Sequence, residues 1–109
     1  MNWLMRLFRT KAPRKQIQQL LLKGAVIIDV RSPKEFSANH LPAAVNIPLQ
    51  LLLQKASLYT KQPVVVVCRT GNLSSMGTAL LKNAGIEAYD GGKWERLHSL
   101  VARQQHACK

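Results

Sequence analysis

The stretch VVVVCRTGNLSS, residues 64–75, runs from an apolar strand pattern through a turn into a helical pattern. Four consecutive valines are typical of a strand that is buried on both faces of a parallel sheet. Gly71 and Asn72 are turn residues, and the helical spacing of apolar residues that follows them ends at Gly85. Cys68 is therefore predicted to lie where a strand ends and a helix begins.

The rest of the chain alternates strand patterns with helical patterns. This alternation predicts a single α/β domain with a small, mainly parallel sheet flanked by helices. We expect further strands at residues 25–30, 43–48 and 87–90. We expect helices over residues 14–23, 49–58 and 73–84. A capping box formed by Ser32 and Glu35 predicts a further short helix, and a last helix is expected from Trp94 onward. Glycines 91 and 92 are interpreted as a turn.

The composition describes a small and strongly basic protein. Its 109 residues include 16 Lys and Arg against 5 Asp and Glu, which gives a formal charge of +11. Such a charge favours an anionic partner, which can be a nucleic acid, an acidic membrane surface, an acidic protein or a small anion. Nucleic acid is not expected, because neither an aromatic platform nor a recognisable binding motif accompanies the charge.

The cysteines and the N-terminal residues bear on the setting of the domain. Two cysteines, Cys68 and Cys108, are too few for a disulfide framework and predict a reduced, cytoplasmic protein. Cys108 is interpreted as a solvated thiol near the chain end rather than a partner that resolves an oxidised Cys68. Residues 1–12 are interpreted as a basic, amphipathic extension to a domain of residues 13–109. For this extension we favour packing on the domain, or disorder, over contact with an anionic membrane.

The loop after Cys68 combines features that favour a reactive thiolate and a bound anion. A helix N-terminus offers unpaired N–H groups and the positive end of the helix dipole. Gly71 lets the backbone approach a bound group closely. The side chains that can add positive charge or hydrogen-bond donors are Arg69, Thr70, Asn72 and Ser74. The alternative is that Cys68 is merely a small buried hydrophobic residue, but that role requires none of these neighbours.

Three segments together resemble the single-domain rhodanese sulfurtransferases. They are VIIDVRSPKEFSANHLPAAVNIPL, VVVVCRTGNLSS and YDGGKW, and the match runs in register from about Leu20 to Leu97. The resemblance implies the rhodanese fold with a five-stranded parallel sheet, and it implies that Cys68 carries sulfur as a persulfide. It also implies that the loop from Cys68 to Leu73 cups this sulfur with backbone amides, without a metal or an organic cofactor.

The resemblance further implies a two-step exchange. The Cys68 thiolate attacks the outer sulfur of thiosulfate and expels sulfite, and cyanide or another thiophilic acceptor then takes the sulfur. Arg69 to Ser74 are the expected substrate-binding residues, and Asp29 and Arg31 are expected to form a structural ion pair near the site. Many relatives carry an arginine where this chain has Leu73, so that Arg69 is the only cation of the loop.

Two other functions are alternatives to this one. The first is a persulfide carrier that a partner enzyme loads and that hands its sulfur to another protein. The second is a cysteine phosphatase or arsenate reductase, whose C-x5-R loop clamps a tetrahedral oxyanion with arginine. This chain has Ser74 at the position of that arginine, which argues against the second alternative.

At two positions this chain has another residue where the relatives commonly have glycine. Asn39 and Ala43 stand there in this chain, and both are interpreted as structural. Asparagine tolerates left-handed backbone more easily than alanine does.

Overall fold

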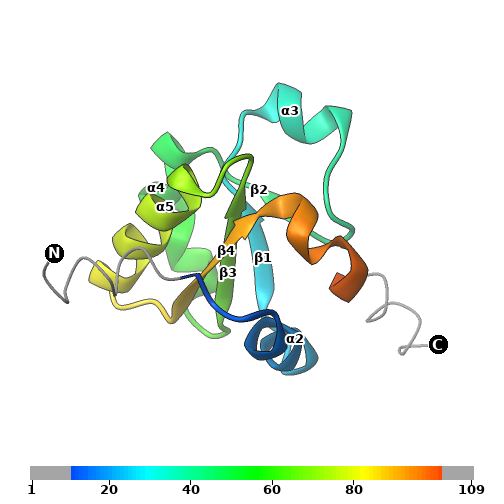
Figure 1. The fold of residues 1–109 in the computed structure, drawn as a ribbon. Helices are drawn as coiled ribbons and strands as arrows, with labels where there is room; N and C mark the ends of the chain where they lie inside the picture. The colour runs from blue at the N-terminus through cyan, green and yellow to red at the C-terminus, as the bar shows by residue number, and fades with distance from the viewer. Residues whose placement is uncertain (1–10, 102–109) are drawn as a thin grey trace, which may run out of the picture.

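Four short strands form one parallel sheet in the computed structural model, which describes residues 11–101 (Figure 1). Their order is β2-β1-β3-β4, and each neighbouring pair is parallel. Parallel neighbours require a crossover connection, which explains why strands and helices alternate along the chain. The strands are β1 (Val26–Asp29), β2 (Val45–Asn46), β3 (Val64–Cys68) and β4 (Ala88–Lys93).

The helices cover both faces of the sheet, as the sequence predicts. The segment expected as one helix over 49–58 is divided into two 3-10 turns around a short α-helix, and the last helix begins as a 3-10 turn and is α-helical over residues 98–101. The elements are α2 (Arg14–Leu22), α3 (Pro33–Ala38), η1 (Leu49–Leu51), α4 (Leu52–Lys55), η2 (Ala56–Tyr59), α5 (Asn72–Asn83) and η3 (Trp94–Leu97).

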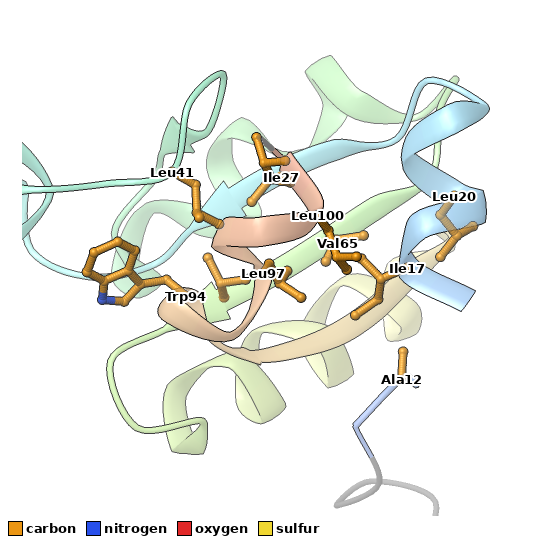
Figure 2. Close-up of a cluster of buried hydrophobic side chains, with 11 residues drawn as sticks. Ala12, Ile17, Leu20, Ile27, Leu41, Val65, Trp94, Leu97 and Leu100 are labelled. Carbon is orange, nitrogen blue, oxygen red and sulfur yellow. The ribbon is translucent and has the colours of Figure 1, made fainter. Parts of the chain in front are cut away.

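The alternation of side chains along β3 produces two separate apolar cores. Val65 and Val67 pack on one face with residues of α2 and of the last helix, among them Ile17 and Leu97 (Figure 2). Val64, Val66 and Cys68 belong to the core on the opposite face, where α4 and α5 pack. Figure 1 shows these two groups of helices on opposite sides of the sheet. The Cys68 side chain therefore lies on the α5 side.

Two expectations about the sheet differ from the structure of residues 11–101. The resemblance implies a five-stranded sheet, but the sheet has four strands within these residues, and the segment before β1 forms the expected helix, α2. The glycine pair 91–92 lies inside β4 rather than in a turn. A Cβ atom on Gly91 would lie 2.8 Å from Val65 Cγ1 and 2.9 Å from Val67 Cγ1, so glycine allows β4 to approach β3 closely there.

Several expectations concern parts of the chain that the structure leaves undescribed. Residues 1–10, with most of the expected extension, and residues 102–109, with Cys108, lie outside the described range. The domain boundary before residue 13 thus stays a prediction. Within residues 11–101 no helix has the length and apolar character needed to cross a membrane.

Candidate active site

Cys68 is the last residue of β3, and its sulfur takes the place of a helix cap. The residue is 1% exposed, and its Sγ accepts hydrogen bonds from the N–H groups of Gly71 at 3.0 Å and Ser74 at 3.2 Å. Gly71 is the N-cap residue of α5 and has no side chain that could accept these bonds. The sulfur therefore accepts from the Ser74 N–H, which the side chain of an N-cap serine or aspartate usually accepts, and also from the Gly71 N–H. Negative charge on the sulfur is stabilised by the helix N-terminus.

A pocket of about 390 Å³ opens beside this sulfur. It lies beyond the carboxyl end of β3, where parallel sheets usually bind their ligands. The walls combine residues of the cysteine loop with two residues of the segment that follows β1. The lining residues are Arg31, Glu35, Cys68, Arg69, Thr70, Asn72 and Leu73.

The residues expected to bind substrate divide into two groups. Arg69, Thr70, Asn72 and Leu73 line the pocket, whereas Gly71 and Ser74 contribute N–H groups to Sγ. The Ser74 hydroxyl is buried and donates to the Gly71 carbonyl at 3.0 Å. It thus holds the loop in shape and does not line the pocket.

Arg69 meets an acidic residue at the rim of the pocket. Its Nε lies 3.6 Å from Oε2 of Glu35, and the two side chains are 74% and 42% exposed. Glu35 also completes the predicted capping box of α3, in which its N–H donates to Ser32 Oγ and its carboxylate accepts from the Ser32 N–H. The contact with Arg69 has no signal in the sequence, because it joins two segments that only the fold brings together.

Asp29 and Arg31 form the expected ion pair below the pocket. Arg31 Nε donates to both carboxylate oxygens of Asp29 at 3.0 Å, and its Nη2 donates to Oδ2 at 2.8 Å. The same Nη2 donates to the carbonyl of Asn39 at 2.7 Å. The guanidinium carbon lies 4.6 Å from the ring centroid of Trp94. Arg31 is buried, and these contacts hold it in the pocket wall.

The two positions without the usual glycine behave differently. Asn39 is extended, with φ −169° and ψ 142°. Ala43 has φ +64°, and among residues 11–101 it is the one residue other than glycine with a positive φ.

The described residues offer no group that resembles a metal centre. Within residues 11–101 no cluster of three or more His, Cys, Asp or Glu side chains could hold a metal ion. His40, a potential ligand or base, is exposed; its Nδ1 lies 2.7 Å from the Phe36 carbonyl and its ring stacks on that of Phe36.

The rhodanese-like domain family matches residues 13–95, which include the whole cysteine loop and all four strands. The chain therefore belongs to this family, as the sequence predicts. Among its relatives is the thiosulfate sulfurtransferase GlpE of Pseudomonas syringae, which is 36% identical over 88 residues, covering 75% of this chain and 81% of that protein.

Two other similar proteins are informative. The human single-domain sulfurtransferase TSTD1 superposes with a TM-score of 0.63 at 26% identity, over 80% of this chain and 94% of that one. The adenylyltransferase and sulfurtransferase Uba4 of Ogataea parapolymorpha is 35% identical over 80 residues, which are 71% of this chain but only 21% of that protein. These similarities confirm the expected rhodanese fold and a sulfurtransferase of the rhodanese type.

Proposed function

We propose that the protein moves sulfane sulfur from thiosulfate to a thiophilic acceptor and carries the sulfur as a persulfide on Cys68. The observation that carries this proposal is the pair of N–H groups at 3.0 and 3.2 Å from Sγ, at the foot of a pocket lined by Arg31 and Arg69. Backbone N–H groups and guanidinium groups both stabilise negative sulfur and an anionic leaving group.

The proposed reaction has two displacements on sulfur. The Cys68 thiolate attacks the outer sulfur of thiosulfate, the sulfur–sulfur bond breaks, and sulfite leaves with the bonding electron pair. The terminal sulfur of the resulting persulfide then bonds to an acceptor such as cyanide, which leaves as thiocyanate while Cys68 regains its thiolate. Neither displacement changes the total charge, and neither requires a cofactor.

The test is sulfur loading, followed by intact mass measurement. Incubation with thiosulfate should add the mass of one sulfur atom, and peptide mapping should locate it on Cys68. Cys68→Ser should abolish loading and turnover with cyanide, because a hydroxyl is far less acidic than a thiol. Cys108→Ser should leave both nearly unchanged. Substantial activity in Cys68→Ser, or sulfur found on another residue, would refute the proposal.

A second candidate is a persulfide carrier that exchanges sulfur with other proteins. The observation that favours it is a row of exposed apolar side chains on α5, namely Leu73, Met76 and Leu80, at 41%, 55% and 37% exposure. Leu73 belongs both to this row and to the pocket lining. Exposed apolar rows next to a site are typical of protein contacts.

The two candidates differ in the donor that they use. Thiosulfate should load Cys68 rapidly if the protein is an independent sulfurtransferase. If it is a carrier, a cysteine desulfurase with free cysteine should load Cys68 much faster than thiosulfate does. A cytoplasmic location fits either candidate and stays a prediction.

A further inference from the structure

Lys11 lies next to the cysteine loop although it is distant from the loop in sequence. The backbone that follows it is attached to β4 and to the last helical segment. The N–H of Ala12 donates to the Asp90 carbonyl at 2.9 Å, and the Ala12 carbonyl accepts from Arg96 Nη2 at 2.7 Å. Arg96 Nε also donates to the Gly91 carbonyl at 3.1 Å. These bonds hold the backbone next to Lys11 beside β4.

The Lys11 side chain passes over two glycines. A Cβ atom on Gly92 would lie 2.8 Å from Lys11 Cδ, and one on Gly71 would lie 3.1 Å from both Cε and Nζ. Because neither position carries a side chain, the lysine side chain can pack directly against both glycines. The Gly71 nitrogen lies 3.0 Å from Cys68 Sγ, and Lys11 Nζ lies 3.1 Å from the Cβ position of the same glycine. Two covalent bonds join that Cβ position to the nitrogen, so the distance from Nζ to Sγ is at most about 9 Å.

Nearby acidic groups do not neutralise this ammonium by direct contact. Within residues 11–101, ion pairs join Arg31 to Asp29 and Arg69 to Glu35, and Lys11 forms none. Asp90, on the adjacent strand, accepts from the Gly92 N–H with Oδ1, while its buried Oδ2 has no hydrogen-bond partner among the residues that the structure describes.

Lys11 is not among the residues that line the pocket beside Cys68. It lines a second hollow of about 360 Å³ together with Thr70, Gly71, Asn72 and Ser75. Thr70 and Asn72 also line the pocket beside Cys68, so the two hollows are neighbours at the loop. Because Lys11 lies outside that lining, an effect of its charge on the pocket would act through the electric field.

We propose that Lys11 is a specificity-determining residue that favours anionic reagents at Cys68. A positive charge within about 9 Å of the sulfur attracts an incoming anion and offsets its repulsion by the thiolate. The inference rests on the proposed function where the anion is thiosulfate. The selection of anions over neutral molecules is nevertheless a property of the site that can be measured without sulfur transfer.

The first measurement compares an anionic with a neutral alkylating reagent. In a Cys108→Ser background, the rate constants for Cys68 with iodoacetate and with iodoacetamide are determined by mass spectrometry. Lys11→Met keeps most of the apolar stem and removes the charge, so the ratio of the iodoacetate to the iodoacetamide rate constant should fall by about twofold to threefold. Lys11→Arg should keep the ratio near that of the parent.

The matched control is Lys61→Met. Lys61 is exposed and precedes β3, whereas Cys68 ends that strand, so the same net charge is lost at the opposite edge of the sheet. Its ratio should change by less than about 1.3-fold. Equal ratios in Lys11→Met and Lys61→Met would overturn the proposal, and so would a loss of selectivity in Lys11→Arg as large as that in Lys11→Met.

The second measurement separates this proposal from the proposed function. With thiosulfate, Lys11→Met should raise KM by about threefold to tenfold and change kcat less. If the parent protein forms no persulfide from thiosulfate, the proposed function fails, while the alkylation ratio still decides the role of Lys11. If thiosulfate turns over normally and the ratio does not respond to Lys11, only the role of Lys11 is refuted.

Discussion

Arg69 and Glu35 place opposite charges at one rim of the pocket, and their effects on an anionic donor should therefore have opposite signs. Arg69→Ala should raise KM for thiosulfate and lower kcat/KM by about tenfold, because a guanidinium that attracts the dianion is lost. Glu35→Gln should lower KM by about twofold to fivefold, because it removes a repelling carboxylate. Glutamine still completes a capping box, so α3 should keep its stability.

Steady-state kinetics at low salt and thermal unfolding test this pair. Serine 32 provides the control, since Ser32→Ala removes the cap but no charge. It should cost about 0.5–2 kcal/mol in the free energy of unfolding with little change in KM. An increase in KM in Glu35→Gln would contradict the electrostatic role of this rim.

Ala43 is held in left-handed backbone, with φ +64°. This conformation costs an alanine about 1–2 kcal/mol and costs glycine almost nothing, although glycine loses more entropy on folding. Ala43→Gly should therefore stabilise the protein by about 0.5–1 kcal/mol. The same substitution inside α5, Ala79→Gly, should destabilise it by about 1 kcal/mol. Denaturant unfolding distinguishes them, and a stability loss in Ala43→Gly would show that the strain at this residue is absent.

At the scale of elements, the turn between β3 and α5 depends on Gly71, whose φ is +99°. Gly71→Ala should strain this turn by about 1–2 kcal/mol and displace an N–H group that lies 3.0 Å from Sγ. Gly85→Ala is the matched control, because Gly85 has φ +85°, follows the far end of α5 and has open space around its Cβ position.

Both glycine variants should lose similar stability in denaturant unfolding. Only Gly71→Ala should slow persulfide formation, by about tenfold or more, since an aligned N–H donor to developing charge is lost. Equal activity in the two variants would mean that the N–H groups are not needed for sulfur transfer.

The elements differ in how far the sequence could predict them. The long helical periodicity and terminal Gly85 predict α5 to within one residue, because both signals are local. The glycines of β4 are typical of a turn in sequence, and their role as places of close approach to Val65, Val67 and Lys11 depends on the neighbouring segments. The same limit applies to the site. The contiguous loop of Cys68 could be predicted, whereas Glu35 and Lys11 reach it from segments that the sequence does not connect.

At the scale of the whole molecule, the parallel sheet and the net charge act together. A parallel sheet places the carboxyl ends of β1 and β3 at one edge, which brings Arg31 beside Cys68. The formal charge of +11 adds a long-range attraction for any anion that approaches this edge. The charge was evident from composition, but its effect on one pocket follows only from the fold.

This combination predicts how salt should affect the choice of donor. Raising NaCl from about 0.05 to 0.5 M shortens the screening length from roughly 14 to 4 Å, so the attraction of a donor by distant charges should largely disappear. KM for dianionic thiosulfate should then rise severalfold with little change in kcat. For the monoanion benzenethiosulfonate, the slope of log KM against log salt should be about half as large, since the energy scales with donor charge. Steady-state kinetics with both donors test this expectation. Equal slopes would mean that local hydrogen bonds, and not the charge of the protein, select the donor.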